Sequence, residues 1–196
     1  QIIDIKFQDI EPPSGQVSEA FREVTNAREE KNTKINNAVK YENDNADIIF
    51  DLTADNINVT GKDAISKNFF NIALNDNPIY NFEINVGATS MNLDFSDYKI
   101  AELDVNGGAC DIDVKLGDLY DFTDVSINTG VSGIKIGVPA NSGCRVICES
   151  VLTNKNFEGF DKKTAGIYET SNYSSAQNVI NIEFAGAVSD FEIYRY

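Results

Sequence analysis

A nine-residue pattern occurs three times between residues 87 and 138, and it is the feature that most constrains the fold. Each copy begins with glycine, continues with small or polar residues, and ends with apolar residues at alternate positions. The copies start at Gly87, Gly108 and Gly130, which are 21 and 22 residues apart, and a looser fourth copy starts at Ala187. A fixed period of about this length indicates a stack of repeated structural units.

Within each copy, the alternation predicts a β-strand with one buried face, because successive side chains of a strand point to opposite sides. Shorter alternating runs lie between the copies, so each repeat is expected to contain two strands and two turns. A single unit cannot bury its apolar face alone, so its neighbours complete the core. We therefore predict a mainly β, β-helix-like stack, with an antiparallel β-sandwich as the alternative. The residues expected to point inward are Met91, Leu93, Phe95, Ile112, Val114, Leu116, Ile134, Ile136 and Val138.

The leading glycines are expected where the backbone needs a positive φ or approaches another segment closely. Outside the array, an alternating strand is predicted over residues 1–10, and a Pro-Pro-Ser-Gly sequence ends it. Further short strands are expected around residues 48–52, 57–59, 79–86, 144–151 and 179–184.

The 196-residue chain carries a formal net charge of −15, which limits the classes of partner that it can bind. Nucleic acid is an unsuitable partner, because phosphate binding needs clustered lysine and arginine. An acidic surface favours cationic partners and disfavours direct docking on an anionic membrane. No apolar run approaches the roughly 18 residues of a membrane-spanning helix. The chain begins with Gln rather than Met, so we expect it to be a segment of a longer protein.

The inventory of reactive side chains predicts neither catalysis nor a bound metal or cofactor. There is no histidine, which removes the commonest general base and metal ligand. Cys110, Cys144 and Cys148 are an odd number and are expected to be buried thiols. Asp94, Asp111 and Asp113 face outward on predicted strands and would serve a calcium site or a glycosidase pair, but no ligand loop accompanies them.

An interaction surface is the remaining interpretation of these polar and aromatic positions. Tyrosines gather toward the C-terminus, where they serve as interface anchors or cover the end of a repeat stack. We predict an interaction surface that includes Asp94, Asp111, Asp113, Tyr168, Tyr173 and Tyr194.

One long helix is predicted between residues 17 and 43. This stretch has no proline or glycine and is rich in residues with high helix propensity. Residues spaced alternately four and three apart form a stripe on this helix that is apolar at its ends and charged in its middle. Such a stripe suits weak self-association, packing on the chain's own sheet, or one end of a longer partner-binding helix. We expect residues 1–45 to form one unit and residues 46–196 to form the β domain.

Residues 1–43 resemble the end of a prohibitin/stomatin (SPFH) domain of the HflK type. The resemblance rests on Asp9-Ile-Glu-Pro12-Pro13 and on Val17, Phe21, Val24, Ala27-Arg28-Glu29, Ile35-Asn36 and Tyr41. It implies a last domain strand that leads into a long helix and assembles rings on the membrane. After Asn43 the sequence departs from that family, as a natural or an engineered fusion would.

Residues 80–196 resemble the toastrack domain, which forms the C-terminal part of LiaF-type envelope-stress proteins. The resemblance rests on Val86-Gly87-Ala88, Leu93-Asp94-Phe95-Ser96, Gly107-Gly108-Ala109, Ile134 to Pro139, Asn141-Ser-Gly143 and Ala187-Val-Ser. It implies a β-helix-like fold and a non-enzymatic module that assembles or senses complexes at the bacterial cell envelope.

We predict a non-catalytic protein-interaction or sensory module of a bacterial envelope-stress or membrane-organisation system. Its partners are other proteins at the membrane, with self-association through the helix of residues 17–43 as a further option. The alternative is an extracellular carbohydrate-binding or carbohydrate-active β-solenoid. A third option is a fusion in which residues 1–43 only promote folding or crystallisation.

Overall fold

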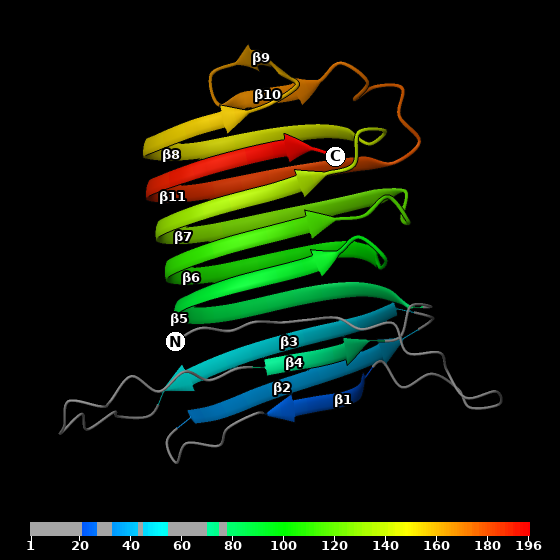
Figure 1. Cartoon of the computed structure of the whole chain (residues 1–196), viewed down its shortest axis with the longest axis vertical. Coiled ribbons are helices and arrows are strands. Elements are labelled where there is room, and N and C mark those ends of the chain that lie inside the picture. The colour runs from blue at the N-terminus through cyan, green and yellow to red at the C-terminus, as the bar shows by residue number, and fades with distance from the viewer. Residues whose placement is uncertain (1–20, 27–32, 43–44, 55–69, 75–77) are drawn as a thin grey trace.

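The computed structural model describes residues 21–26, 33–42, 45–54, 70–74 and 78–196, and these residues form strands joined by turns (Figure 1). In this part of the chain, no helix is long and apolar enough to cross a membrane. The strands are β1 (Phe21–Asn26), β2 (Thr33–Glu42), β3 (Asn45–Ala54), β4 (Phe70–Leu74), β5 (Ile79–Phe95), β6 (Lys99–Leu116), β7 (Phe122–Val138), β8 (Gly143–Phe157), β9 (Phe160–Thr164), β10 (Ile167–Thr170) and β11 (Val179–Arg195).

Nine of these strands form one mixed sheet in the order β2-β3-β5-β6-β7-β11-β8-β10-β9, and β1 pairs with β4 separately. The middle of the sheet is parallel: β5 pairs with β6, β6 with β7, β7 with β11 and β11 with β8. The strands of an antiparallel sandwich would alternate in direction, so this arrangement is different. The mainly β prediction is confirmed, with one nine-stranded mixed sheet as its architecture.

Each long parallel strand bends near its middle and returns across the molecule (Figure 1). Pairing between neighbouring strands is interrupted at Gly87 of β5, Gly108 of β6, Gly130 of β7 and Ala187 of β11, and we place the bend of each strand there. We call the residues before the bend the first arm and those after it the second arm. Each repeat is therefore one continuous bent strand of 17 or 18 residues, rather than the two strands predicted.

The core lies between the first arms and the second arms. Tyr80, Phe82 and Ile84 of the first arm of β5 are buried, and so are Met91, Leu93 and Phe95 of its second arm. All nine positions predicted to point inward in the repeats are buried. Their outward neighbours are exposed or half-buried, except Gly137, which is buried under the ring of Tyr194.

The predicted helix over residues 17–43 needs correction where the structure describes that span. Residues 21–26 and 33–42 are strands, and β2 pairs with β3 over ten residues in one unbroken antiparallel register. Helix propensity is a weak local preference that a long ladder overrides. Residues 17–20, 27–32 and 43 lie outside the described residues. Self-association through the predicted helix stays a prediction. Residues 21–26 and 33–42 would take part in it as strands rather than as a helix.

The expected domain boundary after residue 45 falls at the start of β3, and β2 on its other side belongs to the same sheet. The strands predicted within residues 1–10 and 57–59 lie outside the described residues. The strands predicted around residues 48–52, 79–86, 144–151 and 179–184 all fall within strands of the structure.

Close approach of the backbone explains two of the repeat glycines. A Cβ on Gly108 would lie 2.7 Å from the carbonyl oxygen of Gly87, and a Cβ on Gly130 would lie 2.7 Å from that of Gly108. A Cβ on Gly87 would meet nothing within 4 Å. Positive φ is not the reason, because among the described glycines only Gly159 and Gly166 have it. The bends of successive strands therefore stack too closely for a side chain.

These glycines give a matched test of the stack. We expect Gly130→Ala to destabilise the protein by about 2 kcal/mol, because the methyl group collides with backbone that cannot move independently. Gly87→Ala should change the free energy of unfolding by less than about 1 kcal/mol and with a stabilising sign, because alanine reduces the freedom of the unfolded chain. Urea unfolding followed by circular dichroism measures both. Equal destabilisation by the two variants would contradict the close-stacking explanation.

Candidate functional site

The outward-facing residues of four second arms form one continuous polar surface, which we call the second-arm face. In-register pairing aligns its side chains across β5, β6, β7 and β11. Neighbouring strands lie about 4.8 Å apart, so residues in one row are neighbours. The first row contains Ser90, Asp111, Gly133 and Asp190; the second contains Asn92, Asp113, Lys135 and Glu192; the third contains Asp94, Lys115, Gly137 and Tyr194.

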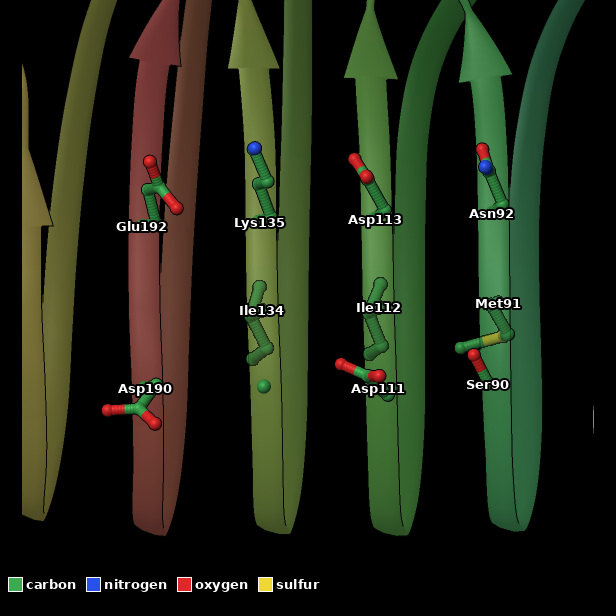
Figure 2. A pocket seen from close by; sticks show the side chains of 11 residues that line it. Ser90, Met91, Asn92, Asp111, Ile112, Asp113, Ile134, Lys135, Asp190 and Glu192 are labelled. Carbon is green, nitrogen blue, oxygen red and sulfur yellow. The ribbon is translucent and has the colours of Figure 1, made fainter.

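A groove of about 380 Å³ lies over the first two rows, and Figure 2 shows the side chains that line it. Gly133 forms a gap between Asp111 of β6 and Asp190 of β11 because it has no side chain. The carboxylate of Asp111 reaches over this glycine, and a Cβ placed there would lie 2.8 Å from Asp111 Oδ1. Within the groove, the backbone of β7 is therefore bare at Gly133.

Carboxylates outnumber lysines on the second-arm face. Both lysines already contact tyrosine rings: Lys115 Nζ lies 4.7 Å from the ring centroid of Tyr196, and Lys135 Nζ lies 5.0 Å from that of Tyr194. Lys115 also lies 4.0 Å from Asp94 Oδ2. Among the described residues, no ion pair is formed by the other carboxylates of this face, namely Asp111, Asp113, Asp190 and Glu192. The face therefore presents uncompensated negative charge.

Tyr194 and Tyr196, at the edge of this face, have raised pKa values. Burial raises the pKa of the Tyr194 phenol, and the nearby carboxylates of Asp113, Asp94 and Glu192 raise it further. Burial also raises the pKa of Tyr196 to about 12, with Asp94 as the largest charged contributor. The Tyr196 hydroxyl donates a hydrogen bond to the carbonyl oxygen of Leu116. Burial is thus the main cause of both pKa shifts, and the carboxylates near these tyrosines add to it.

The structure brings together four of the six residues predicted for an interaction surface. Asp94, Asp111, Asp113 and Tyr194 all lie on the second-arm face. Tyr168 lies elsewhere, in β10, with its ring 4.9 Å from that of Phe157 at the end of the core.

Tyr173 lies over the first arms. Its hydroxyl donates a hydrogen bond of 2.9 Å to Asn181 Oδ1, and the Arg145 guanidinium lies 4.4 Å from its ring centroid. Arg145 in turn contacts Glu169 Oε1 at 2.7 Å. These contacts hold the loop after β10 against β8 and β11, so Tyr173 has a structural role here.

Of the residues that line the groove, sequence reasoning singled out only Asp111 and Asp113, and it missed Lys135, Asp190 and Glu192 among others. The signal that could have found the last two was the loose fourth repeat at Ala187. Its alignment with the earlier copies places Asp190 and Glu192 beside Gly133 and Lys135 of β7, which is the register observed.

The cysteines are buried and free, as predicted. Burial raises the pKa of the Cys144 thiol to about 12, so this thiol stays protonated and unreactive at neutral pH. In the part of the chain that the structure describes, no three cysteine or carboxylate side chains form a group that could hold a metal ion.

The model of one protein family, the N-terminal domain of toast_rack (DUF2154), matches residues 15–137, which is more than half of the chain. The chain belongs to the toast_rack N-terminal domain family. The prohibitin/stomatin resemblance of residues 1–43 is not supported, because the toast_rack match itself begins at residue 15 and covers most of that span. The toast_rack resemblance predicted for residues 80–196 is supported over residues 80–137, and the family match begins further toward the N-terminus, at residue 15.

A solved structure shares the toast_rack fold of this chain. It is the crystal structure of a protein from Clostridium sporogenes described as a candidate cell adhesion protein. The two are 20% identical with a TM-score of 0.75, and the match covers 99% of this chain and 87% of the other. This likeness concerns the fold alone. No protein with curated annotation matches the sequence at a significant level.

The pKa of Tyr196 tests whether its phenol is buried beside the carboxylates of the second-arm face. An absorbance titration of the native protein should show one phenol ionising near pH 12, and Tyr196→Phe should remove that component. The unfolded chain loses this proton near pH 10. The associated stability is therefore complete below about pH 10 and is lost as the pH rises toward 12. If every tyrosine of the native protein titrates near pH 10, the burial and field described here are contradicted.

Proposed function

We propose that this toast_rack domain is a non-catalytic interaction module that binds a basic, extended segment of a partner protein through its second-arm face. We further propose that the partner belongs to a bacterial envelope-stress or membrane-organisation system, because the toastrack resemblance implies a role in assembling or sensing complexes there. The observation that carries the proposal is the groove across Gly133, which has unpaired carboxylates on both sides.

Charge supports a cationic partner. Asp111, Asp113, Asp190 and Glu192 face the groove without ion pairs among the described residues, while Lys135 is the only lining residue of opposite sign. The remainder of the chain is also acidic, so its field attracts cations from a distance and raises the rate of encounter. The contacts of Lys115 and Lys135 with Tyr196 and Tyr194 are examples of ammonium groups held on this face.

Geometry supports an extended partner. Within each row, neighbouring residues lie at the spacing between strands, about 4.8 Å, so each row presents a line of side chains across four strands. A peptide that lies along a row would bring several lysine or arginine side chains within reach of the carboxylates of the face. The arginine fork suits the gap at Gly133, because it can contact two carboxylates at once.

The test uses a synthetic decalysine peptide and isothermal titration calorimetry on the full chain at low ionic strength. We expect Asp111→Asn with Asp190→Asn to weaken binding about tenfold, since each exposed charge contributes up to about 1 kcal/mol. The matched control is Asp118→Asn with Asp121→Asn, which makes the same change of charge in an exposed loop outside the groove. The control should weaken binding less than about twofold, since more distant exposed charges are screened. Equal losses in both double variants would contradict a site at the groove.

Adhesion through carbohydrate is the second candidate. Two observations favour it: the fold is shared with a candidate cell adhesion protein, and the rings of Tyr194 and Tyr196 lie 6.3 Å apart beside the carboxylates. Aromatic rings next to carboxylates suit the apolar faces and hydroxyl groups of sugars. Glycan binding that is lost in Tyr194→Ala would favour this candidate. Turnover of a polysaccharide that is lost in Asp111→Asn or Asp113→Asn would favour a carbohydrate-active enzyme instead.

A further inference from the structure

The second arm of β8 is an edge of the large sheet. On one side it pairs with β11 as far as the Ile193–Phe157 pair. On the other side, β10 pairs only with Arg145, Val146 and Ile147, which belong to the first arm. Among the described strands, none pairs with the outer side of the second arm. Figure 1 shows this edge at the end of the stack opposite to β2 and β3.

The direction of the backbone groups on this edge follows from one hydrogen bond. The Glu158 N–H donates to the carbonyl oxygen of Ile193 at 3.1 Å, so residue 158 points toward β11. Alternate residues of a strand direct their N–H and C=O groups to opposite edges. Lys155 and Phe157 therefore direct these groups away from β11, where no described strand accepts them. Such an open edge is a ready template for another strand.

The core is also incomplete at this edge. In the parallel register, Lys155 and Phe157 pair with Phe191 and Ile193, which are 1% and 0% exposed. Lys155 and Phe157 themselves are only half-buried. The Phe157 ring contacts the Tyr168 and Phe191 rings at 4.9 and 5.0 Å, so an aromatic cluster ends the core here. The first arm of β8 is covered by β10 and β9, whereas the second arm has no such cover among the described strands.

The charge of this end favours a second copy of the same chain as the occupant. Two copies each carry a net charge of −15 and repel one another over most of their surfaces. Residues 150–166 contain three lysines and two acidic residues, so this end of the acidic chain carries a slight positive charge. Copies that approach through this end meet less repulsion than copies that approach through the acidic second-arm face. The same edge on both copies is complementary to itself in an antiparallel pair.

We propose that the chain forms a two-fold symmetric dimer through antiparallel pairing of the second arm of β8 with its counterpart in another copy. The main-chain groups of Lys155 and Phe157 supply hydrogen bonds across the interface, and the two aromatic clusters cover one another's open ends. This interface uses the main-chain edge of β8, one strand beyond Asp190 and Glu192 of the groove, and it does not require the second-arm face to bind a basic partner. Lysine on an edge strand disfavours indiscriminate pairing. The dimer is therefore reversible and concentration-dependent.

The test is analytical ultracentrifugation of the full chain at concentrations from about 1 µM to about 1 mM, which spans weak dimers. The wild-type chain should double in molar mass over this range. Lys155→Pro removes the outward N–H without removing a bond to β11, and it should remain a monomer. Lys155→Thr is the matched control: it removes the same side chain, keeps the N–H, and should still form the dimer.

Three outcomes would overturn the proposal: a wild-type chain that is monomeric throughout, a proline variant that dimerises like the wild type, or a threonine variant that fails to dimerise. If Lys155→Pro does not fold, amide hydrogen exchange of the wild type replaces it. The Lys155 and Phe157 amides should then exchange at least about tenfold more slowly at high than at low protein concentration, because dimers close the edge. Exchange that is independent of concentration would also overturn the proposal.

Discussion

The fold depends on parallel strands that stack in one register while each strand bends at the same place. Apart from one shift between Tyr80 and Asn81 in the β5–β6 pair, the register is kept from β5 through β6 and β7 to β11 and β8, so every bend lies directly over the next. The backbone at Gly130 then approaches the carbonyl of Gly108 too closely for a side chain. Because the bend folds each strand back, one strand supplies both walls of the core and no second sheet is needed to bury its apolar residues.

The same register builds the candidate site. Residues that are about 21 positions apart in sequence become neighbours on the second-arm face, and a residue type that recurs in the repeat becomes a row on the surface. Where the recurring residues are acidic, the row concentrates charge, as Asp111, Asp113, Asp190 and Glu192 do. Where one copy has glycine, as at Gly133, the row has a gap. The shape and charge of the groove therefore follow from small differences between copies of one pattern.

Local patterns in the sequence were sufficient to predict the inward-facing residues of the repeats, because alternation depends only on the geometry of a strand. They were also sufficient to place Asp94, Asp111 and Asp113 on one outward surface. They did not show that each repeat is one bent strand, because the bend is defined by contacts between copies. They were misleading at residues 21–26 and 33–42, where local helix propensity competes with pairing partners that only the fold supplies. Tyr173 was grouped with the site although its contacts with Arg145 and Asn181 hold a loop, which depends on residues distant in sequence.

The parallel register is tested most directly by disulfide formation between cysteines introduced on adjacent strands. In the observed register, Asn92 of β5 pairs with Asp113 of β6, and the Cα atoms of such neighbours are close enough for a disulfide bond. If this register is correct, the double variant Asn92→Cys with Asp113→Cys forms a disulfide readily. The double variant Asn92→Cys with Lys115→Cys, whose cysteines are offset by two residues, does not. The native cysteines are buried and should not compete. If the offset pair oxidises as readily as the in-register pair, the parallel register that defines both the core and the candidate site is wrong.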